Sequence, residues 1–230
     1  MKKLIFVLAV LVGAGSVKAQ DKGLNFSLGA DLVSSYVWRG TYQTKTAFQP
    51  TAGLSLGNFS LSAWASTEFT GPQKEVDFTV GYSVAGLSLA ITDYWWSGEQ
   101  AYKYLKYDSG TAHYWEGSLS YVLPVKSFPL SLSINTMFAG ADKKEGGNKN
   151  NFSTYIEVSL PFTIKEVDLN VGLGATPEKG LYASQASVVN INLKASKEIK
   201  ITDSFSLPVF GQIILNPNQE DIFFVFGFSL

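Results

Sequence analysis

The last nine residues of the sequence, 222–230, place an apolar side chain at every second position, with Phe224, Phe226, Phe228 and Leu230 on one parity. Successive side chains of a strand point to opposite faces, so these four would share one face. In water, such an apolar edge strand would promote aggregation through its unpaired backbone groups. We therefore expect this strand to close a barrel in lipid, with the first strand satisfying its backbone.

The same period of two recurs along the chain. Residues 75–84 alternate Val, Phe, Val, Tyr and Val with Asp, Thr, Gly and Ser, and residues 130–135, 156–160, 167–174 and 189–194 follow the same pattern. Each segment predicts a strand with one apolar and one polar face. A soluble β-sandwich has the same alternation, so the connections must distinguish the two architectures.

The predicted connections alternate in length. Short reversals are expected at residues 57–58, 85–86, 124–129, 161–166 and 202–204. Longer polar stretches are expected at residues 40–47, 70–74, 97–110, 140–150, 176–184 and 216–221. Outer-membrane barrels alternate short periplasmic turns with longer outer loops in this way. The pattern predicts an all-β fold, a transmembrane antiparallel up-and-down β-barrel of twelve strands, with ten or fourteen as the alternatives.

The start of the sequence indicates export. Basic residues at positions 2–3 precede an apolar run at 4–12, and Val17-Lys18-Ala19 precedes Gln20. This is typical of a secretory signal peptide, because the run is shorter than the ~20 residues that a membrane-spanning helix needs. We predict a signal peptide at residues 1–19 and a barrel at 20–230, in the outer membrane of a Gram-negative bacterium.

Charge and cysteine content exclude several function classes. Without Lys2, Lys3 and Lys18 the chain has 15 basic and 19 acidic residues, a net charge of −4, which does not fit nucleic-acid binding. The absence of Cys excludes disulfides and thiolate metal sites, and the single His113 leaves little for metal chemistry. We expect no cofactor and no metal.

Aromatic residues are predicted to form two belts, one at each membrane interface. Those near the short turns are Phe59, Tyr82, Tyr121, Phe162 and Phe205, and those beside the long loops are Trp38, Phe48, Trp95, Trp115, Phe138 and Phe152. The alternative is a general preference of aromatic residues for strands.

A family resemblance rests on residues 34–40, Ser-Ser-Tyr-Val-Trp-Arg-Gly, on Pro50 and on residues 61–66, Leu-Ser-Ala-Trp-Ala-Ser. Tyr-Trp-Trp at 94–96 and Tyr-Trp-Glu-Gly at 114–117 add to it. Over about residues 25 to 125 the chain resembles the bacterial TorF-type porins, whose first hairpins carry a Ser-x-Tyr-x-x-Arg-Gly motif. Ser35 stands where that family has an acidic residue. The resemblance implies an outer-membrane barrel with transport activity.

If the apolar parity faces lipid, the other parity faces the lumen. The charged residues then predicted to line the pore are Asp31, Arg39, Glu68, Asp77, Glu116, Glu157, Asp168 and Lys194. Most other inward positions are small, which predicts a narrow wet bore, the alternative being a charge network that plugs it. Arg39 is predicted to form bidentate bonds to Glu116 or Glu68, the alternative being substrate binding.

The segment 94–115 contains eight aromatic residues. We expect half of them to belong to the outer girdle and the rest to pack the loop 97–110 onto the rim. Sugar binding or narrowing of the pore are the alternatives.

His113 is the one candidate catalytic base. Ser118 and Glu116 lie on the opposite strand parity and would point away from it. We therefore predict no catalytic residue and no enzyme activity.

Together these patterns predict a narrow, passive, mildly cation-preferring channel for small solutes. A non-conducting structural or surface-binding barrel is the first alternative, and an outer-membrane hydrolase is the second. The expected partners are membrane lipid and lipopolysaccharide, the barrel-assembly machinery and small solutes, with no nucleic acid.

Overall fold

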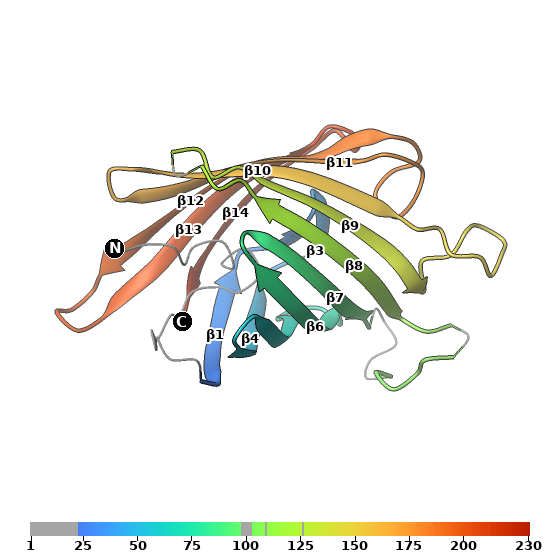
Figure 1. Cartoon of the computed structure of the whole chain (residues 1–230), viewed down its shortest axis with the longest axis horizontal. Helices are drawn as coiled ribbons and strands as arrows, with labels where there is room; N and C mark the ends of the chain where they lie inside the picture. The colour runs from blue at the N-terminus through green and yellow to red at the C-terminus, as the bar shows by residue number, and fades with distance from the viewer. Residues whose placement is uncertain (1–22, 98–102, 109, 126) are drawn as a thin grey trace.

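The computed structural model describes residues 23–97, 103–108, 110–125 and 127–230, and its regular elements are all β-strands (Figure 1). Twelve strands form a closed barrel. They are β1 (Asn25–Val33), β4 (Ala47–Leu56), β5 (Phe59–Glu68), β6 (Lys74–Val84), β7 (Leu87–Trp96), β8 (His113–Val122), β9 (Ser131–Gly140), β10 (Thr154–Ile164), β11 (Val167–Thr176), β12 (Ser187–Lys200), β13 (Ser206–Asn216) and β14 (Asp221–Ser229). The remaining strands, β2 (Tyr36–Trp38) and β3 (Thr41–Thr44), form a separate hairpin.

The all-β fold, the antiparallel order and the count of twelve barrel strands are confirmed. The signal peptide predicted at residues 1–19 lies outside the described residues. Within the described part of the chain, no helix is long and apolar enough to cross a membrane.

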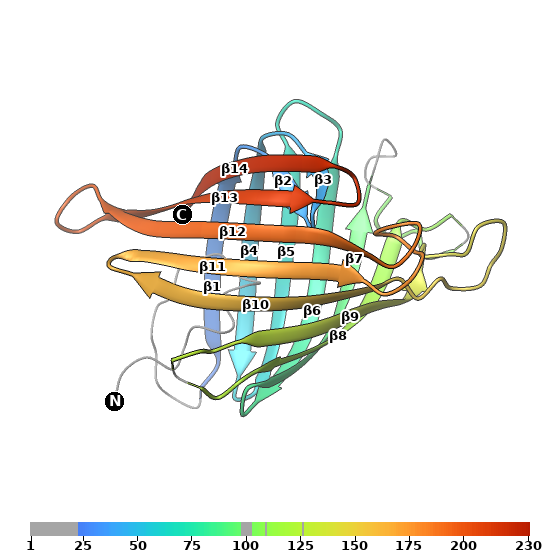
Figure 2. The same ribbon diagram turned by 90° about the horizontal axis from the view of Figure 1, so that it is seen from above.

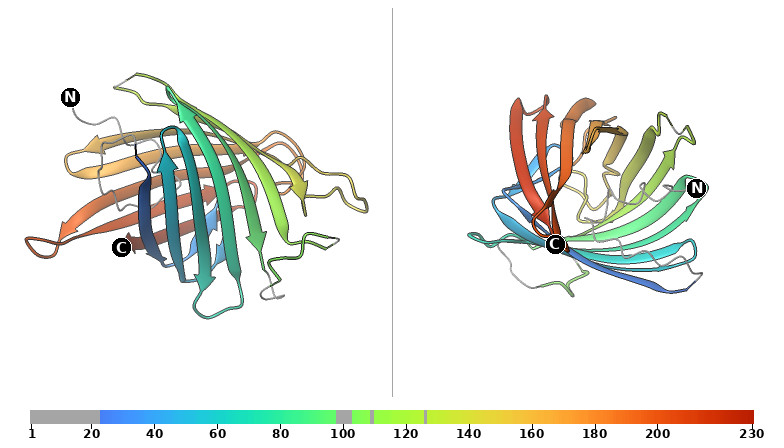
Figure 3. Two further views of the ribbon diagram at one scale, coloured as in Figure 1. Left: turned by 60° about the horizontal axis from the view of Figure 1, so that its bottom comes forward. Right: turned by 90° about the vertical axis from the view of Figure 1, so that its left-hand side faces the viewer.

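The barrel closes where the last strand meets the first (Figure 3). Asp31 pairs with Ser229, and the amide of Leu230 donates to the carbonyl of Ala30 at 2.8 Å. The terminal strand therefore has partners on both sides, β13 and β1, as the sequence predicts. Closure removes the edge that would make this strand prone to aggregation.

The turn predicted at residues 161–166 is shorter in the structure and begins later in the chain. The reversal expected at residues 161–166 is a two-residue turn after Ile164, with Lys165 at φ 55°, and Pro161 lies inside β10. Pairing between β9 and β10 ends at Ser159, so Pro161 has a partner strand on one side only. Its missing N–H is tolerated there as on an edge strand.

Side chains alternate between the two faces of the wall as predicted, except at Val189, which lies at the bulge between β11 and β12 and packs inside. On β6, Phe78 and Val80 are exposed outside while Asp77 is buried inside. On β14, Phe224 is 65% exposed, Phe226 is 58% exposed, and the intervening Val225 is buried. A continuous apolar outer surface of this kind is stable in lipid and unfavourable in water.

Members of both predicted aromatic belts are exposed, but Trp38 and Trp95 differ from the prediction, because Trp95 is buried against Tyr104. Phe59 and Phe205 are exposed near the short turns, and Phe138 and Phe152 are exposed near the long loops. Trp38 is not part of the outer belt, because it belongs to the hairpin that enters the barrel and contacts aromatic residues there.

The barrel is a flattened one, in which β4–β7 cross over β10–β14 (Figure 2). Its interior is largely polar, and its buried apolar cluster is small. That cluster consists of Tyr155, Tyr182, Ala183 and Val189, with Trp38 packed against it. The cluster thus lies where the β2–β3 hairpin meets the wall.

Candidate functional site

The tip of the β2–β3 hairpin is a two-residue turn with unusual backbone geometry. Arg39 has φ 50° and Gly40 has φ 81°, between the paired residues Trp38 and Thr41. Positive φ at both central positions is the requirement of a tight hairpin turn, and it is uncommon for a residue such as arginine. Such geometry persists only where the surroundings impose it.

Gly40 shows what imposes it. The Asn216 side-chain amide donates to the Gly40 carbonyl at 3.0 Å, and a Cβ on Gly40 would overlap the carbonyl of Val189. Asn216 and Val189 are completely buried. The tip is therefore pressed against β12 and β13, and only glycine fits there.

The rest of the hairpin contacts the opposite part of the wall. Tyr36 packs against Trp64 of β5 at 5.3 Å between ring centroids, and Trp38 packs against Tyr94 and Trp96 of β7 at 5.5 Å each. Since the tip touches β12 and β13, the hairpin crosses the lumen. The long loop that the sequence places at residues 40–47 thus contains a strand and folds inward.

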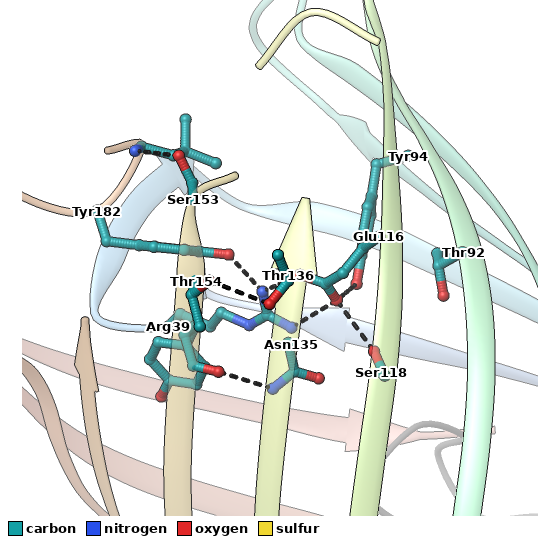
Figure 4. Close-up of polar contacts among 12 residues, drawn as sticks. Arg39, Thr92, Tyr94, Glu116, Ser118, Asn135, Thr136, Ser153, Thr154 and Tyr182 are labelled. Carbon is teal, nitrogen blue, oxygen red and sulfur yellow. Dashed lines mark hydrogen bonds and ion pairs between the residues drawn. The ribbon is translucent and has the colours of Figure 1, made fainter. Parts of the chain in front are cut away.

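Arg39 forms a bidentate ion pair with Glu116 of β8 (Figure 4). The Nη1–Oε2 distance is 2.5 Å and the Nη2–Oε1 distance is 2.8 Å. The side chain of Glu116 is fully buried and that of Arg39 is 12% exposed. This confirms the predicted bidentate bond and selects Glu116 over Glu68, although Arg39 lies on an inserted hairpin and not on a wall strand.

Wall residues hold Glu116 in place from both sides. The hydroxyl of Tyr94 donates to Oε1 at 3.1 Å and that of Ser118 at 3.3 Å (Figure 4). The pairing of β8 with β9 has a bulge between Trp115 and Glu116. Bulges redirect a side chain out of the regular alternation, and they are frequent beside functional sites.

Aromatic rings surround the guanidinium of Arg39. Its Cζ lies 4.4 Å from the Trp38 ring, 4.7 Å from the Tyr155 ring and 5.7 Å from the Tyr182 ring. Nη1 also donates to the Tyr182 hydroxyl (Figure 4). Cation–π attraction strengthens when the ring and the cation are desolvated, as they are here.

Burial and neighbouring groups shift the pKa values of Tyr182 and Arg39. Burial raises the pKa of the Tyr182 phenol well above its usual range, against an opposing effect of Arg39. Burial lowers the pKa of Arg39 and its neighbours Tyr182 and Glu116 raise it, and the net direction is upward.

Two further wall residues complete the surroundings. Tyr155 fits because residue 174 of β11, which pairs with Glu157, is glycine, where a Cβ would overlap the Tyr155 ring. The Tyr155 hydroxyl donates to Glu157 at 2.5 Å and accepts from the Asn190 amide at 2.9 Å. Glu157 is thus linked to the aromatic site through the hydroxyl of Tyr155.

A second acidic group lies beside the hairpin. Glu75 and Asp77 are buried on the inner face of β6, and the Tyr36 hydroxyl donates to Glu75 at 3.4 Å. Oδ1 of Asp77 has no hydrogen-bond partner among the described residues. The sequence analysis left Glu75 out, although it has the parity of Asp77 and could have been found by the same rule.

The other predicted pore-lining residues are spread along the wall. Asp31 accepts from Ser229 at the barrel seam at 2.6 Å, and Asp168 accepts from Thr163 near a short turn at 2.7 Å. Lys194 lies 4.2 Å above the Phe210 ring, and Glu68 is buried at the loop end of β5.

Of the eight predicted residues, the structure therefore brings Arg39 and Glu116 into direct contact. The contacts of Tyr94 with Glu116, and of Tyr155 and Tyr182 with Arg39, were not predicted. Tyr182 lies in a loop, where no periodic pattern marks the direction of a side chain.

His113 lies on the outer face of the barrel, at the loop end of β8. Its Nδ1 is 2.8 Å from Asp93 Oδ1, and its Nε2 is 2.6 Å from the carbonyl oxygen of Tyr104. Both ring nitrogens thus face acceptors, and Ser118 points into the lumen, where it bonds to Glu116. These contacts hold the described part of the loop against His113.

The described part of the loop at 97–110 packs outside the barrel. Tyr104 contacts the outward rings of Phe78 and Trp95, and Tyr107 stacks on His113 at 4.2 Å. These contacts agree with packing of the loop onto the rim. Residues 98–102 and 109 of this loop lie outside the described residues.

Among the described residues, no group of three or more His, Cys, Asp or Glu side chains could hold a metal ion. The chemistry that the lumen site offers is recognition of a cation by a carboxylate and aromatic rings.

No family model and no curated protein matches the chain, so its resemblance to the TorF-type porins stays a prediction. Among solved structures, a crystal structure of a variant of OccD1 (OprD) is similar, with a TM-score of 0.40 and 12% sequence identity. The match covers 92% of this chain and 66% of that chain, so the chain spans slightly less than two thirds of its length. A likeness at this level assigns no function.

Proposed function

We propose that this protein is a porin-like channel for small solutes, in which the β2–β3 hairpin narrows the bore. The observation that carries the proposal is the two-sided wall: a closed barrel with an apolar outer surface and a polar inner surface. A wall of this kind separates lipid from a hydrated interior. The hairpin crosses that interior, and its tip is fixed to Glu116 and Asn216.

We propose further that the channel prefers cations mildly. The predicted pore-lining set contains six carboxylates against Arg39 and Lys194, and Glu75 adds a seventh. Carboxylates concentrated in a confined pore attract cations, and the low dielectric of the wall strengthens their field. Arg39 neutralises Glu116, and the carboxyl groups of Glu75 and Asp77 lie on the inner face of β6.

The proposed location is the outer membrane of a Gram-negative bacterium. The predicted signal peptide supports export, and the exposed apolar belt supports insertion in lipid. Membrane lipid and lipopolysaccharide would then contact this belt, and the barrel-assembly machinery would insert the chain.

A non-conducting structural or surface-binding barrel is the second candidate, because the hairpin crosses the lumen and is anchored at its tip and its sides. The hydrolase alternative has less support, since both nitrogens of His113 already face acceptor oxygens.

The test is the reversal potential of the refolded protein in a planar bilayer with a salt gradient across it. We expect cation preference that weakens as salt rises, because the Debye length falls from about 10 Å at 0.1 M to about 3 Å at 1 M. Asp77→Asn combined with Glu157→Gln should lower the preference. Anion preference would refute the selectivity, and a complete lack of conductance would favour the non-conducting barrel.

A further inference from the structure

The groups that surround the Arg39 guanidinium are held in position by the barrel wall. Glu116 is fixed by hydroxyl groups of Tyr94 and Ser118, which come from β7 and β8. Tyr155 is fixed through Glu157 and Asn190, which come from β10 and β12. None of these bonds involves the hairpin, so the carboxylate and the Tyr155 ring are organised without it.

The cation, in contrast, comes from a separate element. Arg39 is the turn residue of a two-stranded sheet that shares no strand pairing with the barrel. Its guanidinium enters the site from the lumen and satisfies a carboxylate that is itself completely buried. If the hairpin moved away, Glu116 would lose its counter-charge, which is unfavourable for a carboxylate held in the barrel wall.

We propose that this site binds the guanidinium or similar planar cationic group of a solute, and that Arg39 occupies it as a built-in substitute while the hairpin is docked. The site is defined by Glu116, Tyr94, Ser118, Tyr155 and Tyr182. A solute cation that replaces Arg39 compensates Glu116, so departure of the hairpin and arrival of the solute are coupled.

The geometry defines the class of ligand. The two parallel bonds to Glu116, at 2.5 and 2.8 Å, need two N–H donors in one plane, which a guanidinium supplies and a single ammonium does not. The rings of Tyr155 on the wall and Tyr182 in a loop, at 4.7 and 5.7 Å, favour a flat, weakly hydrated cation over a strongly hydrated metal ion.

This inference names a solute class for the proposed channel, and it rests on that function only for the claim that the solute travels through the lumen. Binding itself can be measured at equilibrium, without conductance. A barrel that binds the cation but passes no current would overturn the proposed function alone. A barrel that conducts but does not bind would overturn the inference alone.

The experiment uses the refolded mature chain in detergent micelles, with methylguanidinium chloride as the probe and N-methylurea as its neutral counterpart of similar shape. Titration calorimetry is carried out on the wild type, on Arg39→Ala, and on Arg39→Ala with Glu116→Gln. Lys194→Ala is the matched control, because it removes another inward cation and leaves Arg39 in place. A further variant replaces residues 36–44 by a short Gly/Ser linker, which opens the site if Arg39→Ala does not fold.

We expect Arg39→Ala, or the linker variant, to bind methylguanidinium saturably and at least tenfold more tightly than the wild type and Lys194→Ala. N-methylurea should not bind, and Glu116→Gln should abolish the gain. Equal binding of the urea, retention of binding after Glu116→Gln, or no saturable binding by either opened variant would overturn the inference.

Discussion

Arg39 combines an unusual backbone conformation with a buried charge. Its φ of 50° is stabilised by contacts of its neighbour Gly40, and its guanidinium is neutralised by Glu116 on a distant strand. Residues 39 and 116 are separated by 77 positions in the sequence. A single pair therefore links the conformation of a turn to the charge balance of the lumen.

Removing one member of this pair should release the hairpin. Arg39→Ala leaves the carboxylate of Glu116 without a counter-charge, a loss of about 3–5 kcal/mol for a buried pair. Amide hydrogen exchange of residues 36–44 should accelerate by roughly a hundredfold or more, since each 1.4 kcal/mol is a factor of ten. Adding Glu116→Gln should restore part of the protection, because it removes the uncompensated charge.

Barrel amides on β4 and β5 serve as the internal control and should keep their protection. Unchanged exchange in the hairpin after Arg39→Ala would show that the pair does not hold it.

At the scale of the strands, the alternation of side chains was predictable because it is local. Whether Phe78 and Val80 face outward depends only on the pleat of β6 and on which face meets lipid. The path of the first long loop was not predictable in this way. It depends on Gly40 fitting against Val189 and on Asn216 bonding to the turn, which are contacts across the whole barrel.

The candidate site was also predictable only in part. The pairing of Arg39 with Glu116 could be predicted, because an inward arginine among carboxylates needs a bidentate partner. The contribution of Tyr182 could not, because the direction of a loop side chain follows from tertiary packing against Tyr155 and Trp38.

Neighbouring residues of β9 provide a direct test of the two faces. Leu132 is 42% exposed on the outer side, and Ser133 lies opposite Glu157 on the inner side. Leu132→Arg should cost about 2–4 kcal/mol near the membrane midplane, whereas Ser133→Arg can pair with Glu157 and should be tolerated. Folding yield in lipid vesicles, read from heat-modifiable mobility, measures the difference. Equal loss for both variants would contradict the assignment of faces.

At the scale of the whole molecule, the barrel and the hairpin have separate roles. The wall is a continuous ring of twelve strands, with each strand paired to two neighbours. The hairpin is attached to it covalently through residues 34–35 and 45–46 and otherwise through side chains and the turn. The wall can therefore keep its structure when the hairpin is shortened.

The central claim is that a polar lumen crosses this protein and that residues 36–44 narrow it. The most direct test is single-channel conductance in a planar bilayer, comparing the wild type with a variant in which a short Gly/Ser linker replaces these residues. We expect a small conductance for the wild type and a clearly larger one for the variant, with cation preference retained. A variant that folds in the membrane and passes no more current than the wild type would contradict it.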